Sequence, residues 1–120
     1  MKWRSLLLVP VLLGVAVPPA LAHAMLDHAV PAVGSTVPAP PQRLQLFFTE
    51  PLEPRFSGVT LTSEAGRAVE TGAASVDPQN AAEMVLTVPA LAPGKYKVNW
   101  HAVSTDTHRT EGSFTFEIRH

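Results

Sequence analysis

Apolar and polar residues alternate with a period of two in five segments of this chain, and the pattern predicts half-buried β-strands. In residues 43–48, for example, Leu44, Leu46 and Phe48 fall on one face and are expected to point into a core. Two further segments alternate more weakly. The clear strands are predicted at 43–48, 58–62, 84–88, 95–100 and 113–118, and the weaker ones at 25–30 and 67–71.

The stretches between these strands are rich in residues that form turns. The chain has 12 prolines and seven glycines in 120 residues. Residues 64–66 predict a hairpin turn, and residues 90–94 predict a turn that leads from one sheet to another. The best candidate for a helix, residues 73–83, is interrupted by Asp77 and Pro78. About seven short strands with frequent turns predict an all-β sandwich.

The first 22 residues predict a secretory signal that is removed on export. A short basic stretch precedes an apolar run at 6–17, and residues 20–22 supply the small-x-small pattern that signal peptidase accepts. The apolar run is shorter than the roughly 20 residues that a spanning helix needs. We therefore expect cleavage after Ala22 and an exported protein that consists of one domain, residues 23–120, with His23 at its N-terminus.

Composition narrows the classes of partner and ligand. The predicted mature chain has seven Lys and Arg residues against ten Asp and Glu, a formal charge of −3. It has no basic stripe, so a nucleic acid is not an expected partner. The chain also has no cysteine, which excludes disulfides and the thiolate ligands that Cu(I) and structural zinc favour. Any metal is therefore expected to be bound by nitrogen and oxygen.

Three residues are candidates for a metal site. Cleavage after Ala22 would give His23 a free α-amine beside its imidazole, and the two nitrogens together can chelate an ion. Asp106 and His108 are two residues apart, so both side chains of an extended segment point to the same side. Three nitrogens and one oxygen suit the tetragonal preference of Cu(II), which binds most tightly among the divalent ions. By itself, the Asp-x-His pair also fits a solvated loop in which Asp106 caps a turn.

A longer motif contains this pair. Residues 94–108 read GKYKVNWHAVSTDTH and closely resemble the CopC family of periplasmic copper-resistance proteins, which has the pattern GxYxVxWxxxSxDxH there. The likeness extends over nearly all of residues 23–120. The other similar segments are HAML at 23–26, PAVG at 31–34 and LFFTEPL at 46–52.

The resemblance implies a fold and a site. The fold is an all-β, seven-stranded antiparallel Greek-key β-sandwich of the Ig-like or cupredoxin-like kind. The site binds one Cu(II) ion per chain through the amine and imidazole of His23 with Asp106 and His108. Many members have a glutamate near the site at the position of Glu50. Here Glu50 either orients an imidazole from outside the ligand shell or is a surface carboxylate at a strand end.

The chain departs from part of the family in its methionines. Some members have a methionine-rich loop that forms a separate Cu(I) site, but the matching residues 53–80 contain no methionine. Met25 and Met84 occupy apolar positions of predicted strands and are expected in the core. We therefore expect one Cu(II) site and no high-affinity Cu(I) site.

The remaining histidines are not expected to bind copper. His101 faces away from the Trp100 side by alternation and is expected to be exposed, at a position where relatives often have arginine. His28 is the sixth residue of the predicted mature chain, whereas an amino-terminal chelate needs histidine at the third. His120 is terminal. Arg109 replaces the proline that commonly follows the Asp-x-His motif, so the loop is expected to be less rigid than in those relatives.

These observations and the resemblance predict a monomeric protein, not an enzyme, that carries or buffers Cu(II) in the periplasm or cell envelope, in copper homeostasis or resistance. By resemblance, its partner is a CopD-like inner-membrane copper transporter or another periplasmic copper protein. One alternative is a copper oxidase or oxygenase with a histidine brace, although Asp106 would occupy a position that such chemistry keeps open. The other alternative is an Ig-like interaction module that binds no metal.

Overall fold

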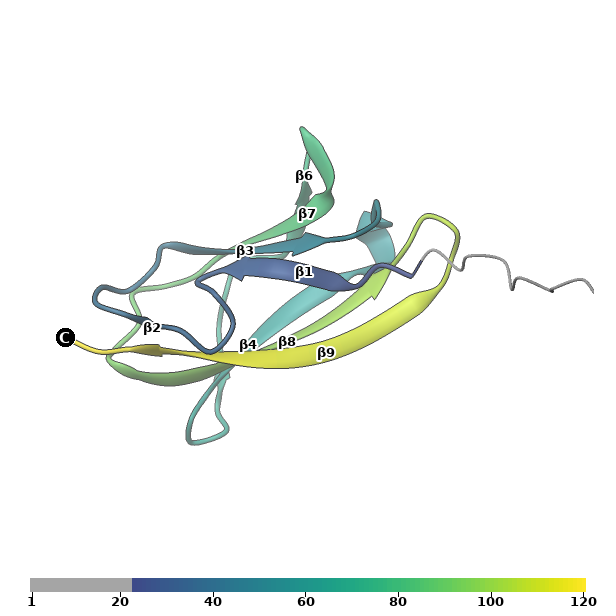
Figure 1. Ribbon diagram of the computed structural model, residues 1–120. Coiled ribbons are helices and arrows are strands. Elements are labelled where there is room, and N and C mark those ends of the chain that lie inside the picture. The colour runs from purple at the N-terminus through teal and green to yellow at the C-terminus, as the bar shows by residue number, and fades with distance from the viewer. Residues whose placement is uncertain (1–22) are drawn as a thin grey trace, which may run out of the picture.

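The computed structural model describes residues 23–120, which form two β-sheets packed face to face (Figure 1). The predicted signal, residues 1–22, lies outside the described residues. One sheet has the strand order β1-β3-β7-β6, with β1 Leu26–Val30, β3 Arg43–Phe48, β7 Asn80–Thr87 and β6 Ser75–Asp77. The other has the order β2-β9-β8-β4-β5, with β2 Thr36–Val37, β9 Arg109–Ile118, β8 Gly94–Val103, β4 Gly58–Ser63 and β5 Ala68–Val69.

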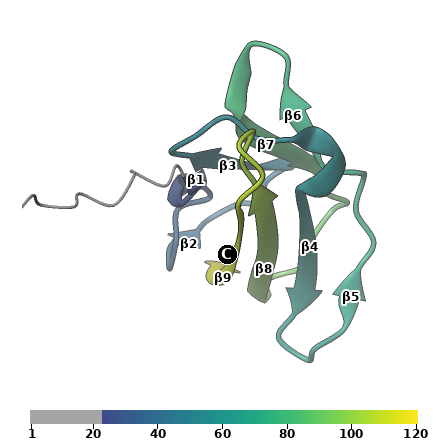
Figure 2. The same cartoon turned by 90° about the vertical axis from the view of Figure 1, so that its right-hand side faces the viewer.

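The chain passes repeatedly from one sheet to the other, as expected for a Greek-key sandwich. Figure 2 shows the two layers end-on, with β4 and β5 at one side and the β6–β7 hairpin at another. Strands pair antiparallel except for β2, which pairs parallel with β9. A short 3-10 helix, η1 Pro54–Phe56, lies between β3 and β4. Nothing else in residues 23–120 is helical, so no described helix is long or apolar enough to cross a membrane.

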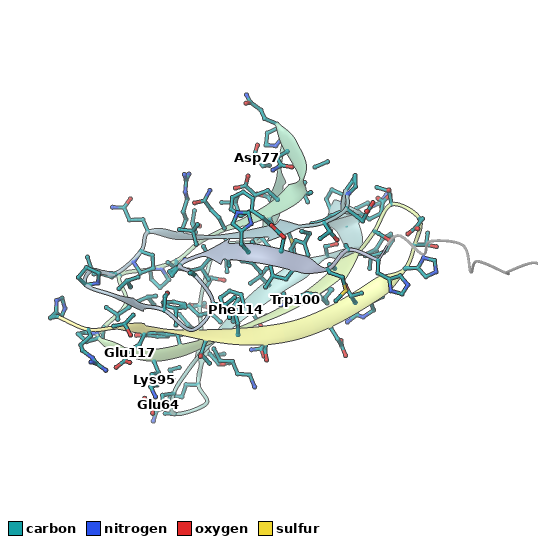
Figure 3. The ribbon with its side chains drawn as sticks, in the orientation of Figure 1. Glu64, Asp77, Lys95, Trp100, Phe114 and Glu117 are labelled. Carbon is teal, nitrogen blue, oxygen red and sulfur yellow. The ribbon has the colours of Figure 1, made fainter. Side chains whose placement is uncertain are left out.

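The core lies between the sheets. It consists of the side chains that point inward from strands in which buried and exposed residues alternate. Trp100 packs edge-to-face on Phe48, with ring centroids 5.2 Å apart. Figure 3 shows Trp100 and Phe114 between the layers, whereas Lys95 and Glu117 lie outside them. The side chains with less than 2% exposure are Leu44, Leu46, Leu61, Met84, Leu86, Val98, Ser104, Phe116 and Ile118.

Both predicted turns are confirmed. The hairpin between β4 and β5 closes through Gly66, whose positive φ of 82° suits glycine and whose N–H donates to the carbonyl of Ser63. The segment 90–94 leads from β7 to β8 in the opposite sheet. Tyr96 anchors that corner, because its hydroxyl donates to the carbonyl of Ala92 at 2.7 Å.

The described residues contain nine strands, two more than predicted. The unpredicted strands β2 and β6 have two and three residues, too few to show alternation. The segment 73–83 contributes to the β6–β7 hairpin, at whose turn the N–H of Gln79 donates to the Asp77 carboxylate at 2.7 Å. A turn here agrees with the interruption of the helical pattern at Asp77 and Pro78.

The prediction that Met25 lies in the core is wrong, whereas Met84 is 1% exposed as predicted. Met25 is 52% exposed, and the neighbouring Ala24 is fully buried. The pairing of β1 with β3 is irregular between Leu26 and His28. Such an irregularity exchanges inward and outward positions. Residues before it therefore alternate in the opposite sense from Ala29, which is buried further along the strand.

Candidate metal centre

The loop that joins β8 to β9 holds two of the three predicted ligands. It closes through backbone hydrogen bonds from Ser104 to His108, 2.9 Å, and from Thr107 to Ser104, 2.8 Å. Thr107 adopts a positive φ of 72°, which makes the turn tight. As a result, Oδ1 of Asp106 lies 3.3 Å from Nδ1 of His108.

Ser104 orients the Asp106 carboxylate. Ser104 is 1% exposed, and its hydroxyl donates a short hydrogen bond to Oδ1 of Asp106. This hydrogen bond is the main cause that lowers the pKa of the Asp106 carboxyl below its ordinary value of 3.8, and the neighbouring His108 lowers it further against the opposing effect of desolvation. The carboxylate is therefore ionised at neutral pH and available as an anionic oxygen ligand.

His23, the third predicted ligand, lies beside this loop at the same end of the sandwich. Its imidazole is 4.9 Å from that of His108 between ring centroids, with the ring planes tilted by 40°. Figure 1 shows the start of β1 and the β8–β9 loop together at this end of the molecule. The fold therefore brings His23 together with Asp106 and His108 from opposite ends of the domain.

Two threonines hold the segment that carries His23, and we call them the threonine clip. The hydroxyl of Thr49 donates to the carbonyl of His23 at 3.2 Å and accepts the N–H of Met25 at 3.0 Å. The hydroxyl of Thr110 donates to the carbonyl of Ala24 at 2.6 Å. The fully buried Ala24 side chain adds a packing contact. The backbone of this segment is thus bound to the ends of β3 and β9.

The two imidazoles present unpaired nitrogens. Nε2 of His23 and Nδ1 of His108 are buried and have no hydrogen-bond partner, and the 3.3 Å contact of His108 with Asp106 lacks hydrogen-bond geometry. A buried polar group left unpaired costs about 1–3 kcal/mol, which coordination to a metal ion would offset. A separation of 3.3 Å also fits neighbouring ligands of one ion with bonds of about 2.0–2.2 Å. The donor set therefore fits a borderline metal ion such as copper.

The predicted ligand set is not complete while Ala22 is attached to His23. Among residues 23–120, no three histidine or acidic side chains are close enough together to hold a metal ion as they stand. The backbone nitrogen of His23 forms a peptide bond with Ala22, so the predicted amine ligand exists only after cleavage. The proposed ligand set therefore depends on processing of the chain.

Sequence reasoning missed the hydroxyls around the site. Ser104 is part of the motif at 94–108, and Thr49 is part of the segment at 46–52, but neither was assigned a role. Thr110 lies outside both segments and gave no signal. Glu50 directly follows Thr49, and no hydrogen bond or ion pair of its side chain occurs among the described residues. Its role near an imidazole stays a prediction.

The other histidines lie apart from this arrangement. His28 stacks on Phe47, with ring centroids 4.3 Å apart, and contacts the carboxylate of Asp27 at 2.8 Å. His101 faces away from the core as predicted. The prediction that it is exposed is wrong: His101 is partly buried, because its ring lies over Gly58, where an added Cβ would come within 2.8 Å of Cε1.

Comparison with known protein families identifies the chain. Residues 26–119 match the family model of the CopC domain. The chain belongs to the CopC family. The resemblance predicted from the motif at 94–108 is thereby confirmed, and so is the predicted β-sandwich class.

Individual CopC relatives agree with this assignment. The chain is 37% identical over 103 residues to Protein YobA of Escherichia coli K12, covering 85% of this chain and 83% of that protein. It is 38% identical over 109 residues to Copper resistance protein C of Pseudomonas syringae pv. tomato, covering 83% of each. The crystal structure of PcoC, described as a methionine-rich copper resistance protein from Escherichia coli, superposes with a TM-score of 0.75 at 35% identity. That match covers 82% of this chain and all of PcoC.

Proposed function

We propose that this CopC protein binds one Cu(II) ion per chain and carries or buffers it in the periplasm after removal of residues 1–22. The observation that carries the proposal is the contact between His23 and His108, whose rings lie 4.9 Å apart with unpaired, buried nitrogens. The copper-resistance function named for several relatives supports copper as the ion. The sequence provides nitrogen and oxygen donors and no thiolate, which favours Cu(II).

Each ligand has a distinct role in this proposal. The amine and imidazole of His23 chelate the ion, and the amine becomes available only when the bond to Ala22 is cut. His108 adds a second imidazole, and the ionised Asp106 neutralises part of the charge of the ion. The threonine clip and Ser104 hold these groups before the metal arrives, so little conformational freedom is lost on binding.

Carriage of copper requires release as well as binding. The ligands of this site suit Cu(II), and reduction to Cu(I) favours softer ligands and lower coordination. Transfer to a CopD-like membrane transporter or to another periplasmic copper protein completes the proposed role of this CopC protein. The site lies at one end of the sandwich, where a partner can approach the ligands directly.

We favour a binding protein over an oxidase with a histidine brace. Asp106 is held beside His108 at 3.3 Å, where it would occupy a coordination position that oxygen activation needs. The copper-loaded protein should therefore release no more hydrogen peroxide in the presence of a reductant than an equal concentration of free copper. Peroxide above that level would favour the enzyme.

The proposed function is tested by titrating the processed protein, residues 23–120, with Cu(II). Electron paramagnetic resonance at one equivalent should show a tetragonal, nitrogen-rich spectrum, and binding should be one to one. A matched protein with one extra glycine before His23 keeps every side chain but moves the amine. It should bind copper at least about tenfold more weakly, since loss even of a group outside the ligand shell costs about 10–100-fold. Weak binding that is indifferent to the glycine would contradict the proposal and favour a metal-free interaction module.

A further inference from the structure

The expectation that this protein lacks a Cu(I) site depended on both mature methionines lying in the core. Met84 does lie there, with 1% exposure, but Met25 is 52% exposed. Its backbone is held on both sides by Thr49, whose hydroxyl accepts the N–H of Met25 at 3.0 Å and whose N–H donates to the carbonyl of Met25 at 2.9 Å. A large apolar side chain is thus anchored in place and directed toward solvent.

Met25 lies on the side of the chain that carries the candidate metal site. Side chains two residues apart in an extended segment point the same way. Ala24 is fully buried, so His23 and Met25 both project from the opposite side of this segment. Two residues of extended chain span about 6.6–6.8 Å, and a methionine side chain has three rotatable bonds. The thioether can therefore reach an ion bound at His23.

We propose that the thioether of Met25 and the imidazoles of His23 and His108 form a three-ligand site for Cu(I). This inference rests on the proposed function, because it uses the same two histidines. A thioether is a soft ligand that prefers Cu(I), and Cu(I) accepts fewer ligands than Cu(II). The carboxylate of Asp106, a hard ligand, contributes to the Cu(II) complex and is dispensable for Cu(I).

The two oxidation states then share one location and exclude each other. The protein holds one copper ion per chain in either state, and exchanges Asp106 and the amine for Met25 when copper is supplied as Cu(I). Residues 53–80 contain no methionine, so this site does not depend on a methionine-rich loop. Because Met25 lies next to the Cu(II) ligands, copper stays on the protein after reduction, and release requires transfer of Cu(I) to a partner and not reduction alone.

The experiment compares the processed protein with Met25→Leu under anaerobic conditions, using Cu(I) itself and a chromophoric Cu(I) chelator as competitor. Leucine keeps the apolar volume and removes the sulfur. The exposed position should leave thermal unfolding of the copper-free protein unchanged. We expect at least about a tenfold loss of Cu(I) affinity, since even a group outside the ligand shell contributes about 10–100-fold. Cu(II) affinity should stay within about threefold of the unaltered protein, because sulfur adds little to a Cu(II) complex of nitrogen and oxygen ligands.

Met84→Leu is the matched control, because it removes a sulfur from the core and should leave Cu(I) affinity unchanged. X-ray absorption of the Cu(I) complex should show sulfur scattering that Met25→Leu abolishes and Met84→Leu retains. Equal Cu(I) affinities of the unaltered protein and Met25→Leu, or a Cu(I) complex without sulfur scattering, would overturn the inference while leaving the Cu(II) proposal intact. Failure to bind either ion would instead reject the proposed function.

Discussion

At the scale of single residues, the chemistry of the candidate site depends on protonation. In the proposed site, His23 of the processed chain offers two nitrogens that bind a metal only when deprotonated, and His108 offers a third. Asp106 differs from them, because the hydrogen bond from Ser104 lowers the pKa of its carboxyl. Nitrogen ligands and the oxygen ligand should therefore respond to acid in separate ranges.

Cu(II) affinity should fall as the pH decreases from about 8 to about 6, since protons compete with the metal for the amine and imidazole nitrogens. Asp106 stays ionised over this range. Asp106→Asn should lower the affinity at every pH but leave the shape of the profile unchanged. Competition titrations with a Cu(II) chelator across these pH values measure both effects. If the affinity instead stayed constant over this range and fell only in stronger acid, with the fall absent in Asp106→Asn, the dependence would belong to the carboxyl.

The same pKa direction has a consequence for the stability of the copper-free fold. The pKa of Asp106 is lower in the folded protein than its ordinary value of 3.8. Its stabilising contribution is therefore fully present above that value and is lost as the pH falls through the lower, folded-state value. The pH at which this stabilising contribution is lost therefore lies well below the pH range in which copper is expected to dissociate.

At the scale of secondary-structure elements, the sandwich positions the site through strand ends. β8 and β9 end at the loop of residues 104–108, and the ends of β3 and β9 supply Thr49 and Thr110. These hydroxyls bind the backbone of the N-terminal segment, which would otherwise be an untethered chain end after cleavage. The threonine clip thus holds the backbone of the proposed ligand His23 in position.

Thr110→Val should weaken Cu(II) binding and destabilise the fold. Valine keeps the branched shape, but the carbonyl of Ala24 loses its hydroxyl donor, at a cost of about 1–3 kcal/mol for an unpaired buried group. Chemical denaturation and Cu(II) titration measure the two effects. Thr110→Ser, which retains the hydroxyl, should restore both. Thr60→Val, at an exposed position of β4, should change neither. If Thr110→Val binds Cu(II) as tightly as the unaltered protein, Thr110 has no positioning role.

At the scale of the whole molecule, copper would join the two ends of the chain. His23 precedes the first strand, and Asp106 and His108 precede the last, so their approach requires the complete sandwich. An ion that binds only the folded state stabilises that state by mass action. Copper binding and global folding should therefore be coupled.

One consequence is that Cu(II) should raise the free energy of unfolding of the processed protein by about 2.7 kcal/mol at a free concentration of 100 times Kd. Thermal denaturation with and without copper measures this, and addition of a strong chelator should reverse it. The protein with an extra glycine before His23 should gain much less. An equal gain in both proteins would show that the stabilising copper binds elsewhere.

Much of the fold could be predicted because it is encoded locally. The bounds of β3 match the predicted 43–48, and β8 and β9 contain their predicted segments. Alternation over six or more residues reports which face is buried, and all three strands are that long. β2 and β6 were not predicted, because strands of two or three residues are too short to show an alternating pattern. Their pairing also depends on strands that are distant in the sequence.

Part of the candidate site could likewise be predicted from a short segment of sequence, and part of it could not. The Asp-x-His pair is visible because two residues on one extended segment share a side, and the structure places these two atoms 3.3 Å apart. The roles of the Thr49 and Thr110 hydroxyls could not be predicted, because their hydrogen-bond partners are backbone atoms far away in the sequence. The bond from Thr110 to Ala24 joins residues 86 positions apart.

The sequence by itself determined the strand-rich fold, the chemistry of the donors and the family. Each of these depends on residue type and on spacing within a short segment. Only the tertiary structure decided that the imidazole of His23 lies beside that of His108 and that the side chain of Met25 points outward. The first depends on how β1 and the β8–β9 loop are brought to one end of the sandwich. The second depends on an irregularity in the pairing of β1 with β3, because strand register is set between strands and cannot be read from one strand alone.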